Sequence, residues 1–342
     1  MTPLVRRSIF GALYALIIAV GLLGPQPLFV VVFGFAIAQT MHEFYSMSLG
    51  ESFKSSRLCA ILAMLTLFVT AYSSRMGLCD GKWMYLTLIP LAVGAVLPLW
   101  SKEYSEYGKM SYWAAGMLFT GAPLALTPVL AVRGGQFDGM LLACIFIIVS
   151  LNDVGAYFLG SSLGQKSGAK KLAPHISPKK SWWGVIGGCI TGVLVSWGLS
   201  ALGWLHLDVA HAMCFGAVLS VVGVLGDLVE SMWKRYFSVK DSGHLIPGHG
   251  GLYDRLDSTI FAIVCAVVYL EVFGLLLSVP AVYQPLQLQE CVLIQAHSFC
   301  IWTPFRRLLR HSPSRRPPSR RDRLRCIPLR RLPRSEGVMS WP

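Results

Sequence analysis

Charged side chains are concentrated in residues 226–258, which lie between two long apolar runs of this chain. The segment reads GDLVESMWKRYFSVKDSGHLIPGHGGLYDRLDS. Its carboxylates belong to Asp227, Glu230, Asp241, Asp254 and Asp257, and its cations to Lys234, Arg235, Lys240 and Arg255. Mg²⁺ prefers hard oxygen ligands such as carboxylates, and cations beside them neutralise the charge of phosphate groups. The segment is therefore predicted to be a metal-dependent phosphate-handling site at a membrane surface.

The first part of this segment is predicted to be a helix with its polar side chains on one face. Asp227, Glu230 and Ser231 stand at positions i, i+3 and i+4. Asp227 directly follows an apolar run, so we expect it at the end of a membrane helix. A solvated helix end with ion pairs is the simpler alternative. However, an aspartate at a helix C-terminal end opposes the helix dipole, and burying it in a membrane is costly. These costs favour a paired or metal-bound Asp227.

A glycine-rich turn follows. In Pro247-Gly248-His249-Gly250-Gly251 the backbone can approach a ligand closely, and its N–H groups can bind phosphate. The spacing of His244 and His249 does not favour zinc. We therefore expect His249 to bind phosphate or to make a structural hydrogen bond.

A second aspartate-bearing helix start closes the segment. Asp254, Asp257 and Ser258 share one face at the start of the next apolar run. Capping of the helix N-terminus would explain Asp257 or Ser258. Two aspartate-bearing helix ends that flank one loop can also converge on Mg²⁺, which completes its shell with substrate phosphates and water. This interpretation makes Asp227 and Asp254 the metal-binding residues.

Residues 152–188 are expected to complete the site. Asp153 lies within an apolar run, where an ionisable residue is a functional candidate. Ser177-Pro178-Lys179-Lys180-Ser181 places hydroxyls and cations beside a rigid proline. The excess of lysine in cytoplasmic loops explains neighbours such as Lys166, but it does not require this grouping. We predict that Asp153, Ser177, Lys179 and Lys180 bind substrate.

The rest of the chain has the composition of a membrane protein. Of its 342 residues, 54% are hydrophobic and only 14% are charged, whereas about a quarter of the residues in soluble domains are charged. Nine apolar segments can be marked, at roughly 4–23, 28–47, 57–73, 84–100, 112–132, 139–159, 183–203, 209–226 and 259–283. We expect an all-α polytopic membrane protein, a bundle of about nine transmembrane helices with a charged site that faces the cytoplasm.

The distribution of Lys and Arg predicts the orientation. With a cytoplasmic N-terminus, the inner loops hold most of the basic residues that lie between spans, whereas the outer loops hold only Arg75, Lys82 and Arg133. Cytoplasmic loops carry the excess of basic residues in membrane proteins. We therefore expect a multi-pass protein of the inner membrane.

Composition divides the chain into a membrane domain, residues 1–285, and an Arg/Pro/Ser-rich tail, residues 286–342. The tail has 12 Arg, no Lys and 3 acidic residues, so it supplies most of the net charge of +13. We expect the tail to be disordered. A lineage-specific extension and a shifted reading frame would each explain it, and we expect no nucleic-acid partner. The nine cysteines contain no CxxC pair, so neither a zinc site nor a disulfide framework is expected.

These segments together resemble the CDP-diacylglycerol synthase family, also called phosphatidate cytidylyltransferase. The family signature stands here as Ser231, Lys234-Arg235, Lys240-Asp241, His249-Gly250-Gly251 and Asp254-Arg255-Leu256-Asp257, with matching spacing. The segments Asp153–Tyr157 and Ser177–Lys180 are also similar to the family's. Two departures stand out: the family usually has Trp-Glu-Gly where this chain has Trp182-Trp183-Gly184, and the tail has no counterpart.

The resemblance implies a reaction in phospholipid biosynthesis, in which CMP is transferred from CTP to phosphatidate to give CDP-diacylglycerol and pyrophosphate. It implies Mg²⁺ bound by Asp227 and Asp254 and leaves a second cation open. Its catalytic residues would be Lys234, Arg235, Lys240, Asp241, His249, Arg255 and Asp257. Ser231, Gly250 and Gly251 would join the substrate-binding residues. The implied partners are CTP, phosphatidate and membrane lipids, and a homodimer is left open.

Two alternatives stay open at this point. A membrane enzyme similar to a polyprenol kinase would also use CTP, but its acceptor is a neutral hydroxyl that requires a general base. A phosphate or ion transporter could use the same charged cluster without turning over CTP. The sequence has no evident internal repeat, which counts against a transporter built from inverted repeats.

Overall fold

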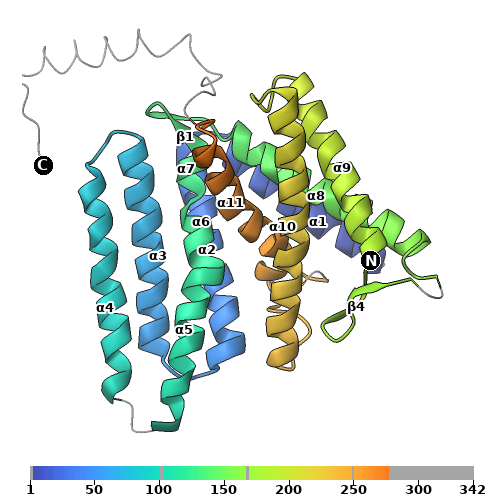
Figure 1. Ribbon diagram of the computed structural model, residues 1–342. Coiled ribbons are helices and arrows are strands. Elements are labelled where there is room, and N and C mark those ends of the chain that lie inside the picture. The colour runs from blue at the N-terminus through green and yellow to red at the C-terminus, as the bar shows by residue number, and fades with distance from the viewer. Residues whose placement is uncertain (1–2, 101–103, 167–168, 249, 277–342) are drawn as a thin grey trace, which may run out of the picture. The chain divides into compact units, whose positions relative to one another are not determined.

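The computed structural model describes residues 3–100, 104–166, 169–248 and 250–276, and most of them are helical (Figure 1). The predicted tail and His249 lie outside these residues. The long helices are α1 (Pro3–Leu23), α2 (Gln26–Leu49), α3 (Lys54–Arg75), α8 (Met140–Ser162), α9 (Trp182–Ala201), α10 (Val209–Tyr236) and α11 (Tyr253–Val272).

Two further segments consist of short helices in series. The first comprises η1 (Gly81–Thr87), α4 (Leu88–Val96) and η2 (Leu97–Trp100). The second comprises η3 (Tyr104–Lys109), α5 (Met110–Gly116), the π-helix η4 (Met117–Gly121), α6 (Ala122–Ala125) and α7 (Thr127–Ala131). Pro123 and Pro128 stand in the first turns of α6 and α7, where a missing N–H costs little, and their rings interrupt the preceding helical hydrogen bonds.

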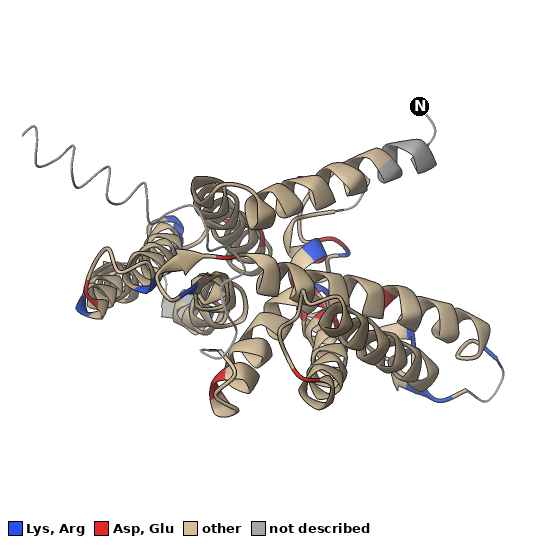
Figure 2. Ribbon diagram, turned by 90° about the horizontal axis from the view of Figure 1, so that it is seen from above, with Lys and Arg blue, Asp and Glu red and all other residues tan. Residues whose placement is uncertain are grey.

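Within the described part of the chain, seven helical segments are long and apolar enough to cross a membrane. They are α2, α3, Gly81–Trp100, Tyr107–Ala131, α8, α9 and α10. The other two expected segments correspond to α1, whose apolar part is Ile9–Leu23, and to α11, whose first turn is charged. Figure 2 shows charged residues in short stretches separated by long uncharged helices. The expected all-α polytopic membrane fold is confirmed.

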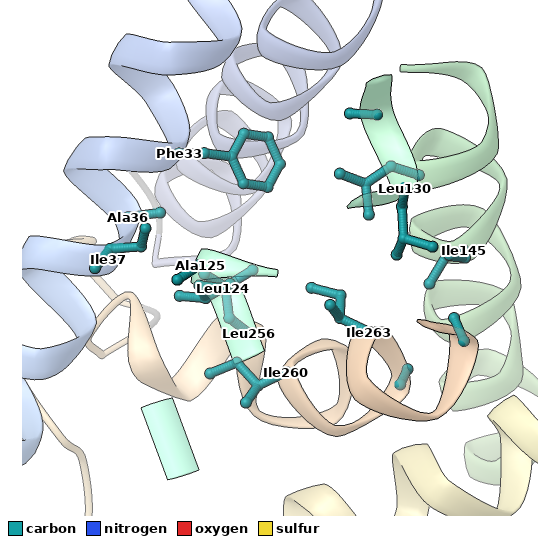
Figure 3. Close-up of a cluster of buried hydrophobic side chains, with 14 of the residues drawn as sticks. Phe33, Ala36, Ile37, Leu124, Ala125, Leu130, Ile145, Leu256, Ile260 and Ile263 are labelled. Atoms are coloured by element: carbon teal, nitrogen blue, oxygen red, sulfur yellow. The ribbon is translucent and has the colours of Figure 1, made fainter. Parts of the chain in front are cut away.

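Helix α11 packs against several other helices in the core of the bundle. Its Leu256, Ile260 and Ile263 are buried and face α2, α6, α7 and α8 (Figure 3). The facing side chains are Phe33, Ala36, Ile37, Leu124, Ala125, Leu130 and Ile145. Because the first turns of this helix pack against protein, the buried Asp254 lies among protein groups rather than lipid, which lowers the cost of keeping its charge in a membrane.

Helices α8, α9 and α10 pack closely through glycines. A Cβ added at Gly155 of α8 would lie 2.0 Å from Thr191 Oγ1 of α9, and one added at Gly192 of α9 would lie 1.9 Å from Ser220 Oγ of α10. Only glycine allows these backbones to approach so closely, as is common between membrane helices. The three helices therefore form one packed wall of the bundle.

The structure differs from the sequence prediction around the charged segments. We expected Asp227 at the end of a membrane helix. Helix α10 instead continues to Tyr236, so Asp227 lies within it. The cations Lys234 and Arg235 in the last turn stabilise this longer helix because they face the negative end of its dipole. Part of the stretch between the expected spans 139–159 and 183–203 forms a hairpin of β3 (Lys171–Ala173) and β4 (Ser177–Ser181). A second hairpin, β1 (Val132–Arg133) and β2 (Gln136–Phe137), connects α7 to α8.

Candidate active site

A cavity of about 710 Å³ brings the two predicted charged segments together. It is bounded by α8, the β3–β4 hairpin, the N-terminal end of α9, α10 and the start of α11. The predicted site residues that line it are Asp153, Lys179, Lys180, Asp227, Lys234, Asp241, Asp254, Arg255 and Asp257. The cavity therefore combines carboxylates and cations from parts of the chain far apart in sequence.

Lys234 holds two carboxylates from different helices. Its Nζ lies 2.6 Å from Glu230 Oε2, one turn earlier on α10, and 2.8 Å from Asp254 Oδ1 on α11. Glu230 and Asp254 are both buried. Since a buried charge is costly unless it is paired, Lys234 offsets this cost for both acids and joins the two helices.

Three carboxylates form a cluster that fits a divalent cation. One oxygen each of Asp227, Glu230 and Asp257 lies within 4.8 Å of the other two. Glu230 is 1% exposed, its Oε2 forms the ion pair with Lys234, and its carboxyl group also lies beside that of Asp254. Carboxylates supply the hard oxygen ligands that suit Mg²⁺ or a similar ion.

Asp254, the expected partner of Asp227 in metal binding, is bonded to its own loop. Its Oδ2 accepts hydrogen bonds from the backbone N–H groups of Ser242 at 2.9 Å and Gly251 at 2.8 Å, and from Ser242 Oγ at 3.0 Å. Its other oxygen accepts from Lys234. The described structure thus groups Asp227 with Asp257 and Glu230, and it uses Asp254 to hold the loop that precedes α11.

The β3–β4 hairpin brings its basic residues to α10. Lys180 Nζ lies 2.6 Å from Asp227 Oδ2, and both side chains are partly exposed to the cavity. Ser181, the residue after it, caps α9 because its Oγ accepts a hydrogen bond from Gly184 N at 3.3 Å. The cap fixes the end of β4 to a membrane helix, so Lys179 and Lys180 are presented at the cavity wall.

Asp153 and Arg255 face the same cavity from α8 and α11. Asn152, which is fully buried, places its Nδ2 3.4 Å from Asp153 Oδ1. Ser231 donates a hydrogen bond from Oγ to Asp227 Oδ1 at 3.2 Å. These polar neighbours orient two of the carboxylates that the sequence analysis selected.

Some predicted site residues lie elsewhere. Arg235 is exposed and donates a hydrogen bond to Ile176 O in the turn of the hairpin. Lys240 is exposed, Ser177 is partly exposed, and neither is among the residues that line the cavity. Gly250, which has φ +84°, packs against Asp254, since an added Cβ would lie 2.5 Å from Asp254 Oδ2.

Glu43 of α2 is a residue of the site region that sequence reasoning did not select. It is 3% exposed, and its carboxylate accepts hydrogen bonds from the backbone at the start of α11. A signal for it exists, because a lone acid in an apolar span is a functional candidate. Glu43 lies about 200 residues before the charged segment 226–258, so no sequence spacing connects it to that segment.

The fold and this cavity define a multi-pass membrane protein with an acidic and basic site suited to phosphate groups. The sequence model of the cytidylyltransferase family matches residues 5–273, and the chain belongs to that family.

Bacterial proteins named phosphatidate cytidylyltransferase are similar to this chain. The one from Staphylococcus epidermidis is 45% identical over 118 residues, which cover 34% of this chain and 44% of that protein. The one from Brucella melitensis is 37% identical over 202 residues, 58% of this chain and 68% of that protein. The one from Haemophilus influenzae is 46% identical over 132 residues, 36% of this chain and 43% of that protein. The chain thus spans less than half of two of these relatives and about two thirds of the third.

Proposed function

We propose that this protein transfers CMP from CTP to phosphatidate, giving CDP-diacylglycerol and pyrophosphate. The observation that carries the proposal is the cavity in which Asp227 and Asp257 of the carboxylate cluster lie beside cations from the β3–β4 hairpin, α10 and α11. Membership of the cytidylyltransferase family and the names of the similar bacterial proteins support the same reaction.

The bond changes of this reaction are few. An oxygen of the phosphatidate phosphate attacks the α-phosphorus of CTP, the new P–O bond forms, and the bond between the α-phosphorus and the bridging oxygen breaks to release pyrophosphate. The attacking oxygen is already anionic near neutral pH, so no strong general base is required. Catalysis then depends on positioning the two substrates and on stabilising the charge that builds up on the phosphates.

The cations of the cavity are proposed to hold these phosphates. Lys179 and Lys180 approach from the hairpin, and Arg255 approaches from α11. Arginine and lysine make short, charge-assisted hydrogen bonds to phosphate oxygens. Lys234 is proposed to act mainly through its ion pairs with Glu230 and Asp254, which keep α10 and α11 at a fixed separation.

Mg²⁺ is proposed as the cation of the acidic cluster, with Asp227, Glu230 and Asp257 as the residues that would hold it. When bound, it supplies positive charge beside the reacting phosphates. Asp254 is proposed to orient the loop before α11 instead of binding the metal, because its oxygens accept hydrogen bonds from that loop.

We further propose that the cavity opens to the cytoplasmic side of the inner membrane. The C-terminal ends of α8 and α10 and the N-terminal ends of α9 and α11 meet at the cavity, and the loops beside them carry the excess of lysine. This orientation would give cytoplasmic CTP direct access, while the lipid would reach the cavity from the bilayer.

Labelled CTP tests the proposed reaction. Purified protein is incubated with phosphatidate, Mg²⁺ and CTP that carries the label on either the α- or the γ-phosphate. Label from the α position in lipid, with release of pyrophosphate, is expected, and Asp227→Asn should abolish it. Label from the γ position in lipid would overturn the proposal in favour of a kinase. Flux of phosphate or ions into sealed vesicles without CTP turnover would overturn it in favour of a transporter.

A further inference from the structure

Helix α2 carries one buried acid that the proposed reaction does not use. Glu43 is the single Asp or Glu of α2, a helix that has no Lys or Arg. Its side chain is 3% exposed in a span that is otherwise apolar enough to cross a membrane. A carboxylate in such a place is costly unless several groups donate hydrogen bonds to it.

The donors to Glu43 come from the start of α11 and the loop before it. Oε1 accepts from Leu252 N at 3.0 Å, and Oε2 accepts from Tyr253 N at 2.8 Å. Ser242 Oγ lies 3.2 Å from Oε2 and shares its one proton between Glu43 and Asp254. Gln39, one turn earlier on α2, donates from Nε2 to Oε1 at 2.8 Å. Three of these four contacts join positions about 200 residues apart in the sequence.

These bonds replace a missing helix cap. The first N–H groups of a helix need acceptors, and a Ser, Thr, Asp or Asn at the N-cap position usually supplies one. Leu252 occupies that position in α11 and has no polar side chain. Glu43 therefore caps α11 from another helix, and its negative charge also suits the positive end of the α11 dipole.

Ser242 connects this cap to the acids of the cavity. Its hydroxyl lies 3.2 Å from Glu43 Oε2 and 3.0 Å from Asp254 Oδ2. Helix α11 begins at Tyr253 and carries Asp254 and Asp257 in its first two turns. A shift of its first turn would therefore move residues that line the cavity.

Two glycines make room for the Glu43 carboxylate. A Cβ added at Gly251 would lie 2.3 Å from Oε2. For a Cβ added at Gly243, the three nearest atoms all belong to Glu43, the closest being Cδ at 2.9 Å. Neither glycine has its φ in the left-handed region, so the contact with Glu43 and not backbone conformation limits the side chain at these positions.

We propose that Glu43 is a positioning residue for the cytidylyl transfer, a cap supplied by α2 that sets where the first turn of α11 places Asp257 and Arg255. The proposal rests on the proposed function for its kinetic consequences. The expected effect of Glu43 on metal binding is independent of that function, because Asp257 belongs to the acidic cluster whatever reaction the protein catalyses.

The test compares Glu43→Ala and Glu43→Gln with Thr40→Val. Thr40 is a matched control because it is fully buried in the same helix and donates its hydroxyl to Ala36 O of that helix. Turnover of CTP and binding of Mn²⁺, followed by its electron paramagnetic resonance signal, are measured on each purified protein. We expect Glu43→Ala to lower kcat/KM by about 100-fold, mainly through kcat, because a displacement of Asp257 and Arg255 by about 1 Å is enough to cause such a loss. We also expect it to raise the Kd for Mn²⁺ by about 10-fold, because Asp257 moves away from its partners.

Glu43→Gln keeps the shape of the side chain but places an NH₂ group against one of the two backbone donors, so its losses of kcat/KM and Mn²⁺ affinity should be intermediate. Thr40→Val should match the wild type in both quantities. A folded Glu43→Ala variant with wild-type kcat/KM and Mn²⁺ affinity would overturn the proposal. If wild-type protein proves inactive towards CTP, the proposed function fails, while the Mn²⁺ affinities still decide the role of Glu43.

A double-mutant cycle covers the case in which Glu43→Ala does not fold. Gly243→Ala alone should displace the Glu43 carboxylate and raise the Kd for Mn²⁺ by about 10-fold. The control is Gly198→Ala, since among the described residues a Cβ added there would meet no side chain or backbone beyond its own stretch of α9 within 4 Å. The double variant Glu43→Gln/Gly243→Ala is then compared with the two single variants. If its loss of Mn²⁺ binding free energy equals the sum of the two single losses, the contact between Glu43 and Gly243 does not affect the acidic cluster, and the proposal fails. A loss smaller than that sum supports the proposal.

Discussion

Lys180 Nζ of the β3–β4 hairpin lies 2.6 Å from Asp227 Oδ2 of α10, so one ion pair joins the two charged segments of the chain. The pair is partly exposed, with side-chain accessibilities of 23% and 33%, and it lies in the wall of the cavity. Such a pair contributes little to stability. Its position beside the acidic cluster instead suits a cation that exchanges its carboxylate partner for a substrate phosphate.

Replacing Lys180 with methionine should therefore affect turnover and not folding. We expect kcat/KM for CTP to fall by about 100-fold, as when one group that stabilises developing charge is removed. Lys170→Met is the matched control, because Lys170 is an exposed lysine next to the same hairpin and does not line the cavity. Its kcat/KM should stay within about twofold of the wild type, as is usual for surface substitutions. Equal losses in both variants would mean that only the net charge of the hairpin matters.

Asp227→Asn and Asp257→Asn should weaken metal binding more than Asp254→Asn does. Two of these acids belong to the cluster with Glu230, whereas Asp254 accepts its hydrogen bonds from Ser242, Gly251 and Lys234. Titration of activity and of Mn²⁺ binding should show a Kd raised by about 10-fold or more for the first two variants.

Asp208→Asn provides the control for this series. Asp208 caps the opposite end of α10, and asparagine caps a helix equally well. If Asp254→Asn were to lose Mn²⁺ more completely than Asp257→Asn, the pairing of Asp227 with Asp254 expected from the sequence would be correct after all.

Removing the charge of Lys234 should destabilise the protein. Lys234→Met leaves Glu230 and Asp254 buried without their shared cation, and breaking a buried pair in this way costs about 3 kcal/mol or more. The second substitution Glu230→Gln in the same chain removes one of the two uncompensated charges. We therefore expect Lys234→Met/Glu230→Gln to recover part of the lost free energy of unfolding in mixed micelles. No recovery would show that Lys234 stabilises the fold by packing and not by charge.

Deletion of residues 286–342 should leave CTP turnover unchanged within about twofold. The family match ends at residue 273, and the cavity is formed by residues 153–257. Activity of the shortened chain and of the full chain would be compared at equal amounts of membrane-inserted protein. A shortened chain that inserts normally but does not turn over CTP would assign the tail a role in the reaction.

Local patterns in the sequence determined the class of fold and most of the residues at the site. Apolar runs of membrane length predicted the helices because a helix in lipid must satisfy its own backbone groups. The spacing of Asp227, Glu230 and Ser231 predicted a shared face on one helix, and all three lie in α10. These inferences succeed because helix periodicity and bilayer thickness act on neighbouring residues.

Which acids face one another was decided by tertiary structure. Asp257 meets Asp227 because glycines let α10 and α11 approach closely, as at Gly226, where an added Cβ would lie 2.7 Å from Asp257 O. The role of Glu43 follows from the packing of α2 against a loop about 200 residues later in the chain. No periodic pattern encodes such contacts, since they depend on how whole helices pack. The sequence by itself therefore predicted the class of fold and the acidic and basic residues of the candidate site, while the packing of α2, α10 and α11 decided which of these side chains meet at the cluster.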